Sequence, residues 1–190
     1  MWKNNGSIVR PSQIDPDWFS NRKDVQIDLP KLLYIGRLKK EKGVFSLLNI
    51  LKSSNRIFNL SLVGKTETDK VDIAVNEKIK VFKLETEKEK LINFYDNHNI
   101  FILPSFTEAH PMVLMESLSR LRPVIIFNDI EHIILNKKGI FVSNRNIEDL
   151  FKKIDFILQN YKSIQEEMKK NIIPTKIEFI KNLSELIMKN

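Results

Sequence analysis

Short, largely apolar runs alternate with segments of helical spacing along most of the chain. The runs with the length of a strand lie at residues 32–35, 60–63, 79–82, 100–103, 124–127 and 140–142. Apolar residues within 44–51 and 147–158 recur three and four positions apart, which is the spacing of an amphipathic helix. Apolar strands that alternate with helices indicate a parallel sheet that is covered on both faces. We therefore expect an α/β, Rossmann-like domain with a roughly six-stranded parallel sheet and helices on both faces.

Two capping patterns predict where further helices begin. Thr86, followed by Glu89, predicts a helix start before the apolar positions at 91–95. Thr175, followed by Glu178, predicts the start of a final helix.

The same patterns divide the chain into three parts. Residues 1–30 hold several prolines and few periodic apolar positions, so we expect an irregular segment with a turn and an aromatic anchor at 14–19. Residues 31–172 carry the Rossmann-like pattern. Pro174 breaks the chain, and residues 173–190 are expected to form a C-terminal helix.

Composition and charge narrow the function classes. The 190 residues are 42% hydrophobic and 29% charged, which is typical of one globular domain. No cysteine is present, which excludes disulfides, thiolate metal sites and cysteine nucleophiles. No run is long and apolar enough to span a bilayer, and the N-terminus lacks the apolar core of a signal peptide, so we expect a cytoplasmic location.

The net charge of +7 is compatible with nucleic acid, an anionic membrane surface or phosphate-bearing substrates. Most lysines have acidic neighbours, as at 39–42 and 85–90, which favours a solvated surface over a nucleic-acid partner. Peripheral contact with the inner membrane face stays compatible with this charge. No two histidines have the spacing of metal ligands, so we predict no metal site.

The stretch from Leu103 to Glu116 is the first candidate for chemistry. An apolar strand leads into a short polar loop, and Pro111 marks the first position of a helix. The N–H groups of Met112 and Val113 would then face an anion in the loop. The structural alternative is that Pro111 only starts a helix, with Glu108 as its cap and Glu116 exposed to solvent.

Three further positions follow the ends of neighbouring strands. Arg37 and Lys42 flank the turn after the first strand and would bring two cations to a pyrophosphate. Gly64 ends the second strand and lets a backbone or a ligand approach closely. His110 lies inside the loop before Pro111, where it could touch a ligand. Alternatively, Arg37 and Lys42 belong to a basic surface turn and bind no ligand.

In order and spacing, these residues resemble the C-terminal, donor-binding domain of a family 4 retaining glycosyltransferase with the GT-B fold. The resemblance runs from about Pro30 to Tyr161. Its markers are Tyr34-Ile35-Gly36-Arg37-Leu38, Glu41-Lys42-Gly43, Leu62-Val63-Gly64, Leu103-Pro104-Ser105, Glu108 with seven residues before Glu116, and Pro123-Val124.

The resemblance implies a role for each matching residue. Arg37, Lys42 and the N–H groups of Met112 and Val113 would hold the donor diphosphate without a metal or other cofactor. Glu108 would contact the donor sugar and is the candidate catalytic residue. The sugar would also lie near His110 and Pro111. Glu116 would bind the ribose, and Gly64, Phe82 and Leu84 would lie near the ribose and base of a UDP or GDP sugar.

The sequence also departs from this family. Families of this kind often have glycine where this chain has Thr66, Leu84 and Leu121. Leu84 projects a side chain where the backbone should meet the base, whereas Leu121 is expected to change only packing. The glycan or lipid-linked acceptor would bind a missing N-terminal domain, so we expect a fragment with little transfer activity. The alternatives are a phosphorylase, a sugar-phosphate synthase, or a non-catalytic binding or assembly module.

Overall fold

The computed structural model describes residues 13–65 and 77–188. Its centre is a six-stranded parallel sheet with the strand order β3-β2-β1-β4-β5-β6. The strands are β1 (Lys31–Ile35), β2 (Asn59–Val63), β3 (Ile79–Phe82), β4 (Ile100–Leu103), β5 (Val124–Phe127) and β6 (Ile140–Ser143). The predicted fold class and all six predicted strands are confirmed. The four central strands are buried over almost their whole length because both of their faces are covered.

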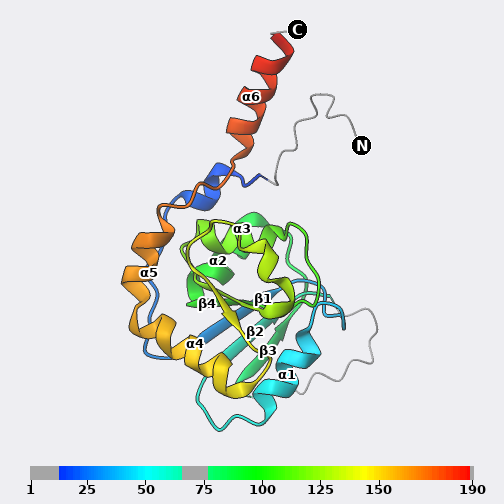
Figure 1. Cartoon of the computed structure of the whole chain (residues 1–190), viewed down its shortest axis with the longest axis vertical. Helices are drawn as coiled ribbons and strands as arrows, with labels where there is room; N and C mark the ends of the chain where they lie inside the picture. The colour runs from blue at the N-terminus through cyan, green and yellow to red at the C-terminus, as the bar shows by residue number, and fades with distance from the viewer. Residues whose placement is uncertain (1–12, 66–76, 189–190) are drawn as a thin grey trace.

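Helices cover both faces of this sheet. The α-helices are α1 (Val44–Lys52), α2 (Lys88–Asn97), α3 (Met112–Ser119), α4 (Ile147–Gln159), α5 (Tyr161–Met168) and α6 (Lys176–Met188). Two 3-10 helices, η1 (Pro16–Phe19) and η2 (Asn128–Ile133), are the remaining elements of the described residues. Figure 1 shows α2 and α3 on one side of the strands and α1 and α4 on the other. No helix among the described residues is long and apolar enough to cross a bilayer.

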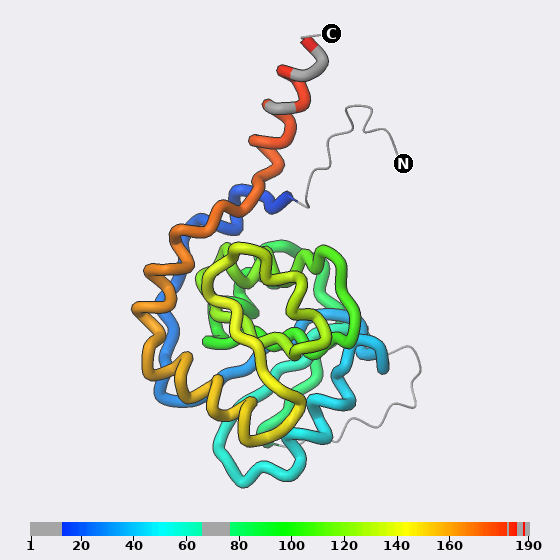
Figure 2. Tube along the Cα trace, in the orientation of Figure 1, coloured from blue at the N-terminus to red at the C-terminus, as the bar shows by residue number. Residues whose placement is uncertain are grey.

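The described part of the N-terminal segment runs beside the end of the chain. The backbone of Ile14 accepts a hydrogen bond from Lys176 and donates one to Pro174, which forms a bridge next to α6. The two segments lie side by side in Figure 2, and α6 then projects away from the sheet. Trp18 is the predicted aromatic anchor, because it is buried edge-on against Tyr95 at 5.5 Å between ring centres. The domain boundaries at residues 30 and 172 stay predictions.

The two predicted capping boxes have opposite outcomes. Thr175 and Glu178 form the expected box, since the Thr175 N–H and hydroxyl donate to the Glu178 carboxylate and the Glu178 N–H donates to the Thr175 hydroxyl. The prediction of a capping box at Thr86 is wrong. The Glu85 carboxylate accepts from the N–H groups of Thr86 and Glu87, and α2 begins one residue after Glu87.

Leu121 does more than change packing, so that prediction is also wrong. Its φ is 55°, in the left-handed region that favours glycine. It follows the C-cap of α3, where the Leu121 N–H donates to Leu118 and the Arg122 N–H donates to Ser117. This pair of bonds is a Schellman motif, which explains why a glycine suits the position.

Leu135 has the same backbone conformation without the compensation of burial. Its φ is 49° and its side chain is 66% exposed, after the end of η2. Asparagine tolerates the left-handed region better than leucine. We expect Leu135→Asn to raise the free energy of unfolding by about 0.5–1 kcal/mol in urea denaturation. Leu135→Ala keeps the backbone cost and should change it little, so an equal gain from both variants would contradict this explanation.

Candidate functional site

The sheet order places two loops side by side at its carboxyl edge. β1 pairs directly with β4, although α1, β2, β3 and α2 lie between them in the chain. The chain proceeds in one direction from β1 and in the other from β4, so a crevice forms where their loops leave the sheet. A cavity of about 260 Å³ lies there. It is lined by Tyr34, Ile35, Gly36, Arg37, Lys42, Leu103, Ser105, Glu108, Pro111, Met112 and Val113.

Gly43 lets the two loops touch. Its φ is +67°, and a side-chain carbon at this position would lie 1.8 Å from the carbonyl oxygen of Pro104. The contact is reinforced where the Phe106 N–H donates to the Glu41 carbonyl at 3.1 Å. The β1–α1 loop is therefore held directly against the β4–α3 loop.

Tyr34 supports the first loop from below. Its side chain is buried, and its hydroxyl donates to the Arg37 carbonyl at 2.7 Å. Burial, and then the charge of Glu108, raise the pKa of Tyr34 well above its usual range, so the hydroxyl keeps its proton and stays a donor. This bond fixes the backbone of Arg37, while the Arg37 side chain is exposed at the edge of the cavity.

Lys42 and Glu108 meet inside the cavity. The Lys42 Nζ donates to the Glu108 Oε1 at 2.7 Å, and the Ser105 hydroxyl donates to the same oxygen at 2.7 Å. His132 contacts the backbone of Glu108, with its Nε2 2.8 Å from the Glu108 carbonyl oxygen. The side chains of Lys42 and Glu108 are 21% and 11% exposed, so this pair is screened less than a surface ion pair.

The start of α3 forms another wall. Pro111 is the N-cap and not the first helical residue, so the helix begins one position later than predicted. The first N–H groups of a helix have no acceptor within it, and together with the helix dipole they favour an anion. Met112 and Val113 both line the cavity. The cavity thus combines two cationic side chains with a helix N-terminus.

Glu116 lies one turn further along α3 and is largely buried. Its Oε2 accepts a hydrogen bond from the Tyr95 hydroxyl at 2.9 Å. Burial raises the pKa of Glu116, and the bond from Tyr95 opposes that shift. Burial, and then the neighbouring Glu116 charge, raise the pKa of Tyr95, which keeps its hydroxyl a donor. Glu116 does not line the cavity with Glu108.

The structure brings six of the predicted site residues to one cavity. These are Arg37, Lys42, Glu108, Pro111, Met112 and Val113. The position of Gly64 requires a glycine, because a side-chain carbon there would lie 1.8 Å from the Gly36 carbonyl oxygen. The other five predicted site residues are Glu116, Gly64, Phe82, Leu84 and His110. They do not line the cavity, and the last three have exposed side chains. Thr66 lies outside the described residues.

Sequence reasoning missed the residues that hold the site in place. Tyr34 and Tyr95 fit the apolar pattern of a strand and a helix, so their hydroxyl bonds had no local signal. Arg145 lies far along the chain after β6, yet its Nη2 donates to the carbonyls of Pro104 and Ser105. In residues 13–65 and 77–188, no cluster of three or more histidine, aspartate or glutamate side chains is arranged to hold a metal ion.

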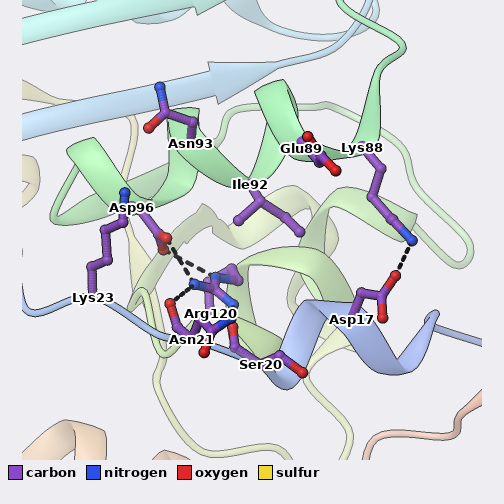
Figure 3. Close-up of a pocket in the computed structure, with 10 residues that line it drawn as sticks. All are labelled: Asp17, Ser20, Asn21, Lys23, Lys88, Glu89, Ile92, Asn93, Asp96 and Arg120. Atoms are coloured by element: carbon purple, nitrogen blue, oxygen red, sulfur yellow. Dashed lines mark hydrogen bonds and ion pairs between the residues drawn. The ribbon is translucent and has the colours of Figure 1, made fainter.

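A second cavity, of about 420 Å³, lies between the N-terminal segment and α2. Figure 3 shows Arg120 in contact with Asp96 and Asn21, and Lys88 in contact with Asp17. The first residues of α2, Lys88 and Glu89, also line this cavity, but its buried charges, Arg120 and Asp96, already pair with each other. We take the cavity between the β1–α1 and β4–α3 loops as the candidate site.

Comparison with known families gives one match over most of the chain. The family model described as "Glycosyl transferases group 1" matches residues 19–175. An uncharacterized glycosyltransferase of Haemophilus influenzae is 26% identical over 171 residues, which cover 81% of this chain and 45% of that protein. The capsular polysaccharide biosynthesis glycosyltransferase CapM of Staphylococcus aureus is 26% identical over 151 residues, covering 73% and 39% respectively. The chain thus spans less than half the length of these relatives.

Solved structures of the same architecture also match. HepE of Anabaena, crystallised in complex with UDP and glucose, superposes with a TM-score of 0.69 at 11% identity. The match covers 94% of this chain and 56% of HepE. At this identity the likeness shows the fold alone, a Rossmann-like domain of the kind found in GT-B glycosyltransferases.

Proposed function

Because the chain belongs to the group 1 glycosyl transferases, we propose that its candidate site binds the diphosphate of a nucleotide-sugar donor. The observation that carries this proposal is the convergence of Arg37, Lys42 and the N-terminus of α3 on one cavity. Two cations and a set of unpaired N–H groups complement the charge of a diphosphate without a divalent cation. Uridine and guanosine diphosphate sugars are the donors we expect, and the complex of HepE with UDP supports the first.

The proposed reaction is retaining transfer of a hexosyl group. The bond between the anomeric carbon and the diphosphate breaks, an acceptor hydroxyl forms the new glycosidic bond, and its proton leaves with the diphosphate. The leaving diphosphate gains negative charge in this step, and Lys42 and Arg37 stabilise that charge. Lys42 would exchange its Glu108 partner for phosphate when the donor binds. Glu108, which also accepts a hydrogen bond from Ser105, is proposed to contact the donor sugar together with His110 and Pro111.

Glu116 is proposed to bind the ribose hydroxyls. A buried carboxylate needs hydrogen-bond donors, and Tyr95 is the one such partner among the described residues. Two ribose hydroxyls would donate further hydrogen bonds to the Glu116 carboxylate. Gly64, Phe82 and Leu84, at the ends of the next strands, are proposed to lie toward the ribose and base.

The acceptor is proposed to be a glycan or a lipid-linked glycan, held by a further domain. The name of CapM supports a role in polysaccharide biosynthesis, and the part of the relatives that this chain does not span leaves room for such a domain. We expect residues 1–190 alone to bind nucleotide weakly and to transfer little or no sugar. The location is proposed to be cytoplasmic, with peripheral contact at the inner membrane face.

The proposal predicts opposite effects of Glu116→Gln on binding and on stability. Glutamine cannot offer a charged acceptor to the ribose, so the affinity for the nucleotide that binds best among UDP, GDP and ADP should fall about tenfold or more in calorimetric titration. Folding raises the pKa of Glu116 above its value of about 4.5 in the unfolded chain. Ionisation of Glu116 at higher pH therefore lowers the free energy of unfolding of the wild type. The variant should therefore match the wild type near pH 4 and be the more stable of the two at pH 7.

Glu89→Gln is the matched control, because Glu89 is an exposed glutamate on α2. It should leave the nucleotide affinity unchanged. If the wild type bound none of the three nucleotides at millimolar concentration, this result would contradict the donor site and favour a non-catalytic binding or assembly module.

A further inference from the structure

Arg145 connects the far end of the sheet to the candidate site. It lies between β6 and the N-cap of α4, and its side chain is 17% exposed. Its Nη2 donates to the carbonyl of Pro104 at 2.8 Å and to that of Ser105 at 3.0 Å. Both carbonyls belong to the loop that leaves β4, so the guanidinium satisfies backbone acceptors that no strand or helix pairs.

Three other groups hold the guanidinium itself. Its Nε donates to the Asp129 Oδ2 at 2.7 Å. Its central carbon lies 4.0 Å from the ring centre of Phe106 and 4.5 Å from that of Phe127. A planar group fixed by a carboxylate, two aromatic rings and two carbonyls is far more constrained than a surface ion pair.

The loop that Arg145 holds leads directly to the cavity. Ser105 donates from its hydroxyl to the Glu108 carboxylate, which also accepts from Lys42. The neighbouring Phe106 N–H donates to the Glu41 carbonyl on the opposite loop. A displacement of Pro104 and Ser105 would therefore move the carboxylate and loosen the contact between the two loops.

We propose that Arg145 is a positioning residue of the donor site, which fixes the Glu108 carboxylate through the backbone of Pro104 and Ser105. This inference rests on the proposed function for its effect on sugar donors. It adds to that function a residue that touches neither the cavity nor the donor. A lysine cannot replace it, because an ammonium group cannot span Asp129 and two carbonyls in one plane.

A double-mutant cycle tests whether Arg145 acts through Glu108. UDP, GDP, ADP and their glucose conjugates are titrated by calorimetry into the 190-residue protein and its variants. Arg145→Met should weaken binding of the preferred glucose conjugate about tenfold, and Arg145→Lys should restore only part of it. In a Glu108→Ala background the Arg145→Met effect should shrink to less than about twofold. Equal effects in both backgrounds would overturn the proposal.

Hydrogen exchange of the Phe106 amide provides a test that needs no ligand. Arg145→Met should accelerate this exchange about tenfold or more, while the amides within β2 stay unchanged. Arg56→Met is the control, because Arg56 also joins an aspartate, Asp155, to an aromatic ring, Phe151, but far from the cavity. If Phe106 exchange is unchanged in the Arg145 variants, the positioning role is overturned. If exchange is accelerated but the wild type binds no nucleotide, only the proposed function is overturned. If Arg145→Met does not fold, Asp129→Asn and Arg145→Lys are measured in the same two ways.

Discussion

Asp96→Ala is expected to lower the free energy of unfolding by about 3–5 kcal/mol. The Asp96 carboxylate accepts from the Nε and Nη2 of Arg120 at 3.0 and 2.7 Å and lies 3.4 Å from Arg122. All three side chains are at most 2% exposed. Loss of the carboxylate would leave two buried guanidinium groups without a counter-charge, which costs more than the pair itself contributes.

The same change should release the N-terminal segment. The other bonds of Arg120 go to the carbonyls of Trp18, Ser20 and Asn21, so the cluster ties this segment to α2 and α3. Urea denaturation measures the stability, and Trp18 fluorescence follows the release. Asp155→Ala removes an exposed partner of Arg56 and should cost less than about 1 kcal/mol. Similar costs for the two variants would show that the buried cluster is not the anchor.

Lys42→Met is expected to reduce nucleotide affinity by about tenfold to a hundredfold. A charge-assisted hydrogen bond to phosphate contributes about 1.5–3 kcal/mol. Lys42 is also the cation nearest Glu108, so its loss leaves that carboxylate facing the incoming diphosphate without a neutralising partner. Calorimetric titration of the nucleotide that the wild type prefers measures the effect.

Lys40→Met is the matched control for this change. Lys40 is an exposed lysine of the same loop, and the variant alters the net charge by the same amount. Long-range attraction alone would weaken both variants equally. A local diphosphate contact predicts that Lys40→Met changes affinity less than about twofold.

The central part of the fold could be predicted because its signals are local. Six apolar runs predicted six strands, and the spacing of Ile147, Leu150, Phe151 and Ile154 predicted α4, whose inner face is buried. The motif residues of the β1–α1 and β4–α3 loops met at one cavity because parallel strands place such loops at one edge. Leu121 escaped prediction because its left-handed backbone is set by the end of α3 and not by its own preference.

The supporting contacts of the site could not be predicted. Arg145 contacts Pro104 across 41 positions, and Arg122 contacts Asp96 across 26. Such long-range contacts leave no periodic pattern, and in a chain with 31 lysines and arginines a single arginine has nothing to distinguish it. The role of Tyr95 as the partner of Glu116 was hidden for a related reason, because its ring obeys the apolar spacing of α2.

A crystal structure of the 190-residue protein with bound UDP or GDP, whichever binds more tightly in titration, tests the proposed donor site. We predict a diphosphate between the β1–α1 and β4–α3 loops, with Arg37 and Lys42 on one side and the N–H groups of Met112 and Val113 on the other. We also predict ribose hydroxyls within hydrogen-bonding distance of Glu116. A nucleotide bound instead in the cavity beside Asp17 and Arg120, with the candidate site unchanged, would contradict the proposed donor site.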